Sequence, residues 1–324
     1  MNVLLALVLA IAALLLALAA LLFLFTRRTA RRVEAALPPA GRFVDVPGAR
    51  LHVVERGQGP TLLLLHGLSG QLGNFSYGMI EPLARDFHVV AVDRPGAGYS
   101  TRSPGAGADL PAQADVLAAL IDKLGLDRPL VVGHSLGGAI ALALAIGHPG
   151  RVGGLALVAP LTHPPGGIPS VFKALTIARP WVRRLVAWTL AVPMSIARSE
   201  QVMEIVFGPD PVPADFATRG YGLLALRPGH FIAASEDLIA AGHSLPPLLP
   251  RYDALRLPVS ILFGRDDRIL DPAQNGEALA ARVPGATLIL VTGGHMLPIT
   301  AVDTTVEFVR KSAARLQEVS LVPA

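Results

Sequence analysis

Ser135 is the residue of this 324-residue chain whose surroundings most clearly suggest chemistry. It lies in a G-x-S-x-G pattern between Gly133 and Gly137, after an apolar run and before a stretch rich in Ala and Leu. A serine on a sharp strand-to-helix turn needs small neighbours, and the positive end of the following helix favours a developing oxyanion. The alternative is a serine that only caps the helix. The pattern predicts that Ser135 is a nucleophile.

Candidates for a base, and for an acid that orients it, follow two later apolar runs. Asp266 and Asp267 come directly after one such run, and His295 comes after the last one. A serine hydroxyl needs an imidazole to take its proton, and a buried carboxylate then fixes the tautomer of that imidazole and stabilises its cation. The chain order therefore predicts a Ser–Asp–His triad, with two aspartates available for the acid.

Another apolar run ends in His66-Gly67, where the chain must turn. A backbone N–H in this turn and one at the start of the helix after Ser135 can face the same oxygen, so we assign the oxyanion hole to Leu68 and Leu136. Losing one such donor typically raises the barrier by about 3 kcal/mol. His66 itself is expected to make structural hydrogen bonds and to take no part in proton transfer.

Taken together, these motifs resemble the α/β-hydrolase superfamily. The resemblance covers most of residues 42–310 and is carried by His66-Gly67, Asp93-Arg94-Pro95-Gly96-Ala97-Gly98-Tyr99-Ser100, Gly133-His134-Ser135-Leu136-Gly137-Gly138, Gly264-Arg265-Asp266-Asp267 and Gly293-Gly294-His295. It implies a catalytic triad of Ser135, Asp267 and His295, because the acid in such proteins stands three residues after the glycine that ends its strand. It also implies that Asp93 braces loops.

The pattern of apolar runs predicts the fold class, which is α/β. An antiparallel hairpin, Phe43–Val46 with Leu51–Glu55, precedes short runs that are apolar almost throughout, as in a parallel sheet buried on both faces. The expected strands are Thr61–Leu65, His88–Val92, Leu130–Val132, Leu155–Val158, Val259–Phe263 and Thr287–Val291, and helices are expected at Leu110–Leu124 and Leu136–Gly147. We therefore expect an α/β-hydrolase fold with a mostly parallel central sheet flanked by helices.

The stretch from Leu161 to Leu257 has no clear strand and predicts a helical lid inserted before the strand that carries the catalytic Asp. The alternative is a set of ordinary peripheral helices. The expected division is a transmembrane helix at 1–26, a basic juxtamembrane linker at 27–41, a core at 42–160 and 258–324, and the lid at 161–257. The arginines of the lid are interpreted as a solvated face; they are Arg179, Arg183, Arg184, Arg198 and Arg219.

Residues 3–25 carry no charged side chain and would span about 35 Å as a helix, enough to cross a bilayer. We expect a single-pass N-terminal membrane anchor, with a cleaved signal peptide as the alternative. No Lys or Arg precedes the span, and an arginine cluster follows it (Arg27, Arg28, Arg31 and Arg32). The positive-inside rule then predicts a catalytic body on the cytoplasmic side.

Composition and motifs exclude several function classes. The chain has no Cys, which excludes disulfide scaffolds and cysteine nucleophiles, and the resemblance makes Asp-nucleophile epoxide hydrolases and haloalkane dehalogenases improbable because Ser135 occupies the elbow. Outside the arginine cluster the basic residues equal the 24 acidic ones in number, so no nucleic-acid partner is expected. The histidines show no metal-ligand spacing and no phosphate or dinucleotide loop is found, so neither metal nor cofactor is expected.

The expected activity is hydrolysis of carboxylic esters, with a small lipophilic or medium-chain acyl ester as substrate and the bilayer, through residues 3–25, as partner. The plan is similar to that of membrane-anchored esterases and monoacylglycerol lipases. One alternative is a carbon–carbon bond hydrolase of ring-cleavage products, in which arginines of the lid would bind the carboxylate of the substrate. Another alternative is a lactonase. A non-catalytic membrane-tethered scaffold is the third. The sequence does not predict the oligomeric state.

Overall fold

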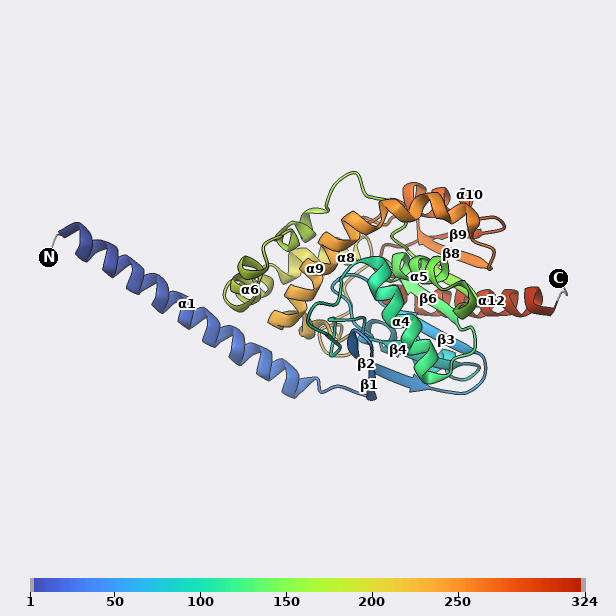
Figure 1. The fold of residues 1–324 in the computed structure, drawn as a ribbon, viewed down its shortest axis with the longest axis horizontal. Coiled ribbons are helices and arrows are strands. Elements are labelled where there is room, and N and C mark those ends of the chain that lie inside the picture. Colours follow the sequence, from blue (N-terminus) through green and yellow to red (C-terminus); the bar gives the residue numbers. More distant parts are fainter. Residues whose placement is uncertain (1–2, 322–324) are drawn as a thin grey trace.

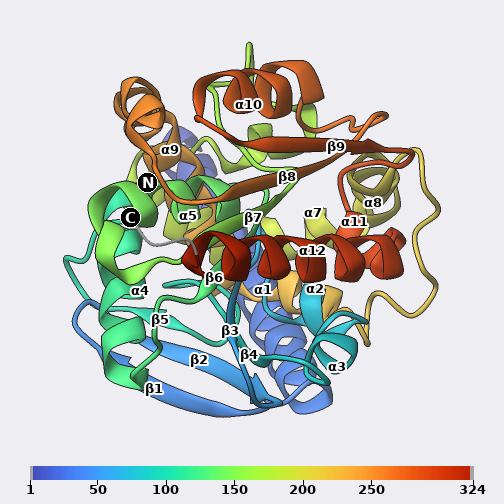
Figure 2. The same ribbon diagram turned by 90° about the vertical axis from the view of Figure 1, so that its right-hand side faces the viewer.

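The computed structural model describes residues 3–321, and within them the fold is built on a nine-stranded sheet (Figures 1 and 2). The strand order is β1-β2-β4-β3-β6-β7-β8-β9, with β5 paired to β2. The strands are β1 Arg42–Val46, β2 Ala49–Arg56, β3 Thr61–Leu65, β4 His88–Val92, β5 Thr101–Arg102, β6 Leu130–His134, β7 Gly154–Val158, β8 Val259–Gly264 and β9 Thr287–Val291. The expected hairpin and strands are confirmed, and β5 is the strand that the sequence did not predict.

The sheet is parallel from β4 through β3, β6, β7 and β8 to β9 and antiparallel at β1 and β2, as expected. Strand β3 shows why its residues are apolar throughout. Leu63 and Leu65 pack into the core on one face, whereas Leu62 and Leu64 pack into the core on the other. Because the sheet is parallel, the C-terminal ends of β3, β6, β8 and β9 lie at one edge, where loops can bring distant residues together.

Helices cover both faces of the sheet (Figure 2). α4 Leu110–Leu124 and α5 Leu136–Gly147 supply one core, and α3 Ile80–Leu83 and α12 Val302–Leu321 supply the other. The expected bounds of α4 follow from its caps, since Asp109 accepts the Ala112 N–H at 3.0 Å and Gly125 ends the helix at φ 62°. Shorter elements are α2 Gly73–Ser76, η1 Pro149–Arg151, η5 Ala273–Glu277, α10 Ala278–Arg282 and α11 Leu297–Thr300.

The stretch expected as a lid contains no strand in the structure. Its elements are η2 Ser170–Leu175, α6 Pro180–Trp188, α7 Ala191–Ala197, α8 Ser199–Phe207, η3 Gly222–Leu226, α9 Pro228–Ser244 and η4 Pro246–Ala254. Helix α9 is the long helix of this segment and packs against α6 (Figure 1). We refer to residues 161–257 as the lid segment.

Helix α1, Val3–Ala36, is long and apolar enough to cross a membrane by length and composition. Its N-terminal part extends away from the body (Figure 1), whereas Thr26, Ala30 and Val33 are buried against it. The helix continues without a break through the arginine cluster, so the first part of the expected linker is helical. Residues 1–2 and 322–324 of the expected anchor and core lie outside the described residues.

Candidate active site

The turn between β6 and α5 holds Ser135 at φ 55° and ψ −121°, a backbone conformation that residues other than glycine rarely adopt. A Cβ on Gly133 would lie 2.7 Å from the Gly137 carbonyl oxygen, and a Cβ on Gly137 would lie 2.1 Å from the Leu65 carbonyl oxygen. Neither position can therefore hold a larger residue without displacing backbone. The glycines of the G-x-S-x-G pattern are present because strand, turn and helix meet there at van der Waals distance.

Ser135, His295 and Asp267 form one hydrogen-bonded chain. His295 Nε2 lies 3.0 Å from Ser135 Oγ, and His295 Nδ1 lies 2.7 Å from Asp267 Oδ2. The other carboxylate oxygen, Oδ1, accepts the N–H groups of Ile269 and Leu270 at 2.8 and 2.9 Å. Because a carboxylate only accepts, Nδ1 carries the imidazole proton, and Nε2 is left to accept from the serine.

The second aspartate of the pair makes different contacts. Asp266 accepts the Gly293 N–H at 3.5 Å and donates its own N–H to the Gly293 carbonyl at 3.1 Å. Asp267 has a fully buried side chain and is the aspartate that contacts the imidazole. The structure thus brings Ser135, Asp267 and His295 together and places Asp266 in the turn beside them.

The loop after β3 passes directly beside Ser135. A Cβ on Gly67 would lie 2.9 Å from Ser135 Cβ and 3.4 Å from its Oγ. Leu68, from this loop, and Leu136, at the start of α5, both line the cavity onto which Ser135 opens. Both residues expected to supply oxyanion donors therefore lie at the cavity.

His66 has the structural role expected of it. Its Nδ1–H donates to the Gly67 carbonyl at 2.9 Å, and its Nε2 accepts the Arg94 N–H at 3.0 Å. Burial, and next the nearby positive charge of Arg94, hold its pKa well below the ordinary value, so the ring stays neutral. Neutrality is what these two bonds need, because one ring nitrogen donates and the other accepts.

Arg94 is a residue of this site that sequence reasoning missed. Its guanidinium donates to the carbonyl oxygens of His66 and Gly67, both at 2.9 Å, and so supports the loop beside Ser135. The same guanidinium donates to Asp237 of α9 at 2.8 Å, and both side chains are only 1% exposed. The loop is therefore tied to the lid segment. Its one sequence signal was its position next to Asp93 in the motif after β4.

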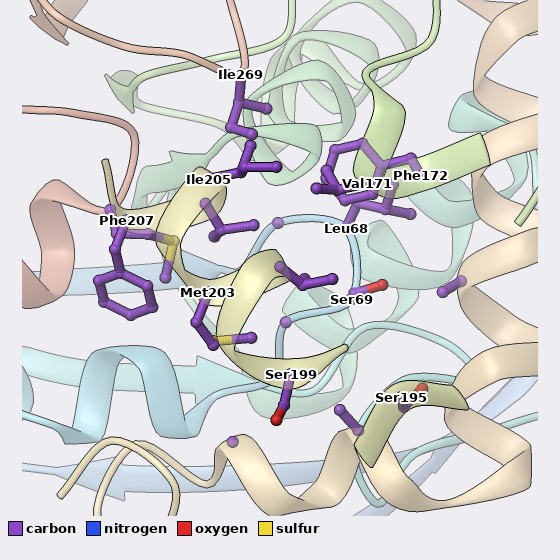
Figure 3. A pocket seen from close by; sticks show the side chains of 18 of the residues that line it. Leu68, Ser69, Val171, Phe172, Ser195, Ser199, Met203, Ile205, Phe207 and Ile269 are labelled. Carbon is purple, nitrogen blue, oxygen red and sulfur yellow. The ribbon is translucent and has the colours of Figure 1, made fainter. Parts of the chain in front are cut away.

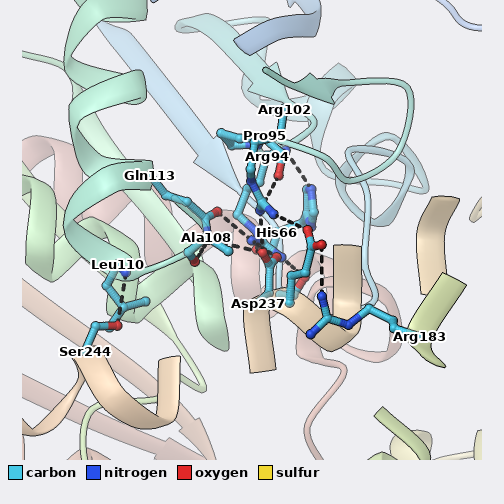
Figure 4. A network of polar contacts seen from close by, with 12 residues as sticks. His66, Arg94, Pro95, Arg102, Ala108, Leu110, Gln113, Arg183, Asp237 and Ser244 are labelled. Atoms are coloured by element: carbon cyan, nitrogen blue, oxygen red, sulfur yellow. Dashed lines mark hydrogen bonds and ion pairs between the residues drawn. The ribbon is translucent and has the colours of Figure 1, made fainter. Parts of the chain in front are cut away.

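The ion pairs around Asp237 continue into the lid segment (Figure 4). Arg102 donates to Asp237 at 2.6 Å and to Glu236 at 2.9 Å, and Arg183 of α6 donates to Glu236 at 3.0 Å. The interpretation of Arg183 as part of a solvated lid face is wrong, since the residue is 6% exposed. Burial is possible because Glu236 supplies the opposite charge and Ser235 accepts from Nε at 3.0 Å.

Asp93 braces loops, as expected. Its carboxylate accepts the N–H groups of Leu72 and Tyr99, each at 2.8 Å, and pairs with His52 Nδ1 at 2.7 Å. Burial opposes protonation of His52, but the hydrogen bond and charge of Asp93 outweigh it and raise the pKa of the histidine. The motif after β4 thus positions backbone.

A second carboxylate of the lid segment contacts the loop that carries His295. Asp210 accepts the Gly294 N–H at 2.9 Å and the Thr300 hydroxyl at 3.0 Å. A Cβ on Gly294 would lie 2.3 Å from the Gly208 carbonyl, so the two segments touch through their backbones. Sequence reasoning also missed Asp210, because an aspartate in a Pro-rich loop carries no local signal.

Ser135 and His295 open onto a cavity of about 1540 Å³ beneath the lid segment. Figure 3 shows side chains from α8, from η2 and from the loop after β8 converging on it. Its labelled apolar residues are Leu68, Val171, Phe172, Met203, Ile205, Phe207 and Ile269. Among the described residues, no group of three or more His, Asp or Glu side chains could hold a metal ion. The arrangement can bind an apolar group next to an activated hydroxyl.

Comparison with known proteins places this architecture. A family model described as the alpha/beta hydrolase fold matches residues 60–302. The 30 kDa subunit of magnesium chelatase from Rhodobacter capsulatus is 31% identical over 78% of this chain and 86% of its own length. The acetyltransferase component of the acetoin cleaving system from Cupriavidus necator is 42% identical, but over 38% of this chain and only 32% of its own length.

A similarity to a solved structure extends over almost the whole chain. The crystal structure of a membrane phospholipase A, described as a bacterial virulence factor, has 25% identity and a TM-score of 0.66. The alignment covers 97% of this chain and 97% of that one. These relatives differ in their named activities, so they identify the fold but not the substrate, which has to be inferred from the site. The chain belongs to the alpha/beta hydrolase fold family, and it is a hydrolase.

Proposed function

We propose that this hydrolase cleaves carboxylic esters with lipophilic or medium-length acyl chains through an acyl-enzyme on Ser135. The observation that carries the proposal is the contact of 3.0 Å between Ser135 Oγ and His295 Nε2 at the floor of a large cavity with apolar walls. The helix-capping alternative for Ser135 has no support, because its side chain makes no capping hydrogen bond and instead contacts the imidazole.

In the proposed mechanism, His295 Nε2 takes the hydroxyl proton as Ser135 Oγ attacks the ester carbonyl. The backbone N–H groups of Leu68 and Leu136 stabilise the oxyanion of the tetrahedral intermediate. The imidazolium donates its proton to the departing alkoxide, and Asp267 stabilises that cation throughout. Water then enters, gives a proton to His295 and attacks the acyl carbon, which releases the acid and restores the Ser135 hydroxyl.

The cavity supports a lipophilic acyl group as the substrate's recognised part. Apolar side chains enclose the space above Ser135, and burying each methylene of an acyl chain contributes about 0.8 kcal/mol. A carbon–carbon hydrolase would need a cation for the substrate carboxylate. Of the five lid arginines considered for that role, Arg198 alone lines the cavity, and Arg183 is paired with Glu236. Lys173 also lines the cavity, but apolar side chains make up most of the cavity wall, and this favours an ester with a lipophilic acyl group.

We further propose that residues 3–25 anchor the enzyme in a membrane and stay attached to it. Thr26 is fully buried, the Phe23 ring lies 5.3 Å from the Trp188 ring, and Glu34 pairs with Arg227 at 2.9 Å. A helix that packs against the folded body in this way is part of the body, which argues against cleavage as a signal peptide. The arginine cluster that follows the span favours a cytoplasmic body.

The activity is tested with the full-length chain in detergent micelles and p-nitrophenyl esters of increasing acyl length. We expect turnover that peaks at medium or long chains and is lost in Ser135→Ala. Ser103→Ala, in an exposed loop away from the cavity, should retain full activity and serves as the matched control. Folded protein that cleaves none of the esters would contradict the proposal.

A further inference from the structure

Helix α6 turns an apolar stripe outward. Trp181, Leu185 and Trp188 recur at spacings of four and three residues, which places them on one face of the helix, and their exposed fractions are 64%, 53% and 36%. The inward face carries Ala187 and the ion-paired Arg183, both buried. A surface helix of a water-soluble protein shows the reverse arrangement, with its apolar side inward. This outward face is therefore suited to an apolar partner.

The apolar surface continues beyond α6 and has a basic margin. Leu190, Met194 and Ile196, on and next to α7, are 47%, 41% and 44% exposed. Arg184 and Arg198 are exposed beside them. We call the six apolar residues Trp181, Leu185, Trp188, Leu190, Met194 and Ile196 the apolar lid face. Trp and Leu with flanking Arg are the composition of segments that lie in the interface of a phospholipid bilayer.

The contact between α6 and α1 sets the depth of this face. The Phe23 and Trp188 rings are 5.3 Å apart, and Phe23 lies one helical turn before the arginine cluster begins at Arg27. Trp188 is thus level with the point where the apolar span of α1 ends. Figure 1 shows α6 at the edge of the body nearest to the N-terminal half of α1. A bilayer that holds residues 3–25 would reach the apolar lid face at its headgroup boundary.

We infer that the apolar lid face is seated in the same phospholipid bilayer that α1 crosses, and that the active-site cavity opens into that bilayer. Met194 and Ile196 carry the second half of this inference, because both are exposed in the lid face and both line the cavity. A lipophilic ester could enter between them without leaving the membrane. The inference rests on the anchoring and the lipophilic substrate class of the proposed function.

Charge selects a lipid surface over a second copy of the chain as the occupant. The exposed arginines of α1 lie on the helix that borders the apolar lid face, and Arg184 and Arg198 are exposed beside it. Pairing two copies through this face would bring the arginines of both copies close to one another. Anionic phospholipid headgroups complement them, and each basic side chain near such a surface contributes about 1 kcal/mol.

The chain contains two tryptophans, Trp181 and Trp188, and both lie in the lid face, so tryptophan fluorescence reports on this surface alone. Full-length chain is reconstituted in phosphatidylcholine and phosphatidylglycerol vesicles, with and without bromine atoms on the acyl chains. Trp188→Phe leaves Trp181 as the sole emitter, and Trp181→Phe leaves Trp188. We expect the brominated lipid to quench most of the emission of both variants, and aqueous iodide to quench little of it.

The matched control moves the emitter to an exposed apolar position outside the lid face. Ile289, on edge strand β9, is 43% exposed, so Ile289→Trp in a Trp181→Phe, Trp188→Phe background should be quenched by iodide and not by brominated lipid. Trp188 alone responding to brominated lipid would overturn the inference, because its contact with Phe23 places it beside the anchor in any case. Trp181 is the decisive residue.

A kinetic comparison separates this inference from the proposed function. The double substitution Trp181→Ser, Leu185→Ser should slow hydrolysis of an ester embedded in vesicles at least tenfold (~1.4 kcal/mol) and leave p-nitrophenyl acetate hydrolysis unchanged, since neither residue lines the cavity. Equal rates of vesicle hydrolysis for wild type and variant would contradict the seating. Absence of all ester hydrolysis in the wild type would contradict the proposed function, whereas the fluorescence result would still decide the seating.

Discussion

Asp237, on helix α9 of the lid segment, accepts a hydrogen bond of 2.8 Å from Arg94, and neither side chain is more than 1% exposed. Arg94 also donates to the carbonyl oxygens of His66 and Gly67, in the loop that passes beside Ser135. The lid segment is thus joined to the loop that supplies a proposed oxyanion donor. The lid segment therefore does more than cover the active site, because its carboxylates Asp237 and Asp210 contact the loops beside Ser135 and His295.

This relationship predicts that Asp237→Asn lowers kcat about tenfold, equivalent to ~1.4 kcal/mol, with little change in KM. The amide cannot neutralise Arg94, so the guanidinium shifts and the Gly67 loop loses its fixed position. Steady-state kinetics on a p-nitrophenyl ester measure the effect, and the midpoint of thermal unfolding in detergent is recorded alongside. Glu236→Gln is the control, because Glu236 pairs with Arg102 and Arg183 but not with Arg94. A variant with lowered thermal stability and wild-type kcat would show that the pair is structural only.

The geometry of the two neighbouring aspartates predicts opposite outcomes for them. Asp267→Asn should lower kcat about 10⁴-fold, because the amide cannot hold the imidazole in the required tautomer or stabilise its cation. Asp266→Asn removes one long contact to Gly293 and should lower kcat less than about tenfold. The ratio of the two kcat values is the measurement. Comparable losses would contradict the assignment of the acid to Asp267.

Most of the sheet and the nucleophile turn could be predicted because their signals are local. Thr61–Leu65 and His88–Val92 are strands with the expected bounds, since a strand buried on both faces must be apolar at every position. The nucleophile turn has a local signal as well. Gly137 approaches the Leu65 carbonyl so closely that only glycine fits there, and the sequence therefore shows the G-x-S-x-G pattern that identifies Ser135.

The remainder of the site could not be predicted because it depends on long-range contacts. Asp237 and Arg94 are 143 positions apart in the sequence, and no pattern near either residue indicates that they form a hydrogen bond. The same holds for Arg183 of α6, which can be buried because it pairs with Glu236 from another helix of the lid segment, α9. Apolar residues at helical spacing, such as those of α6, normally predict a buried helix face. Only the packing shows that this face points outward.

The glycine geometry predicts substitutions of opposite sign. Gly137→Ala should destabilise the fold by about 3 kcal/mol, since the new methyl group would lie 2.1 Å from the Leu65 carbonyl oxygen. Gly242→Ala, at an exposed position of α9 with open space around it, should stabilise the fold by about 0.5–1 kcal/mol. Urea unfolding in detergent compares both variants with the wild type. A neutral Gly137→Ala would mean that the turn can move, contrary to the structure.

Buried histidines predict a loss of stability in mild acid. Burial, and next the neighbouring His295, lower the pKa of His134 to about 3, and burial, and next Arg227, lower the pKa of His230 to about 4. The unfolded chain binds these protons below pH 6.5 and the folded chain does not, so the free energy of unfolding falls as pH decreases from 6.5 toward 4. Each histidine contributes up to about 1.4 kcal/mol per pH unit in this range.

This dependence is measured by urea unfolding at several pH values. His134→Asn should reduce the slope of unfolding free energy against pH, whereas His243→Asn, at an exposed position of α9, should leave it unchanged. A wild-type stability that is independent of pH between 4 and 6.5 would contradict the prediction.

Labelling with a fluorophosphonate shows whether Ser135 is an activated nucleophile. Such a probe phosphonylates a serine whose hydroxyl proton can pass to an adjacent imidazole, and needs no knowledge of the substrate. Full-length protein in detergent is treated with the probe, and the modified peptide is identified by mass spectrometry. We expect one adduct per chain, on Ser135, which is absent in Ser135→Ala and forms far more slowly in His295→Ala. Folded wild-type protein that remains unlabelled, or that is labelled at another residue, would contradict this prediction.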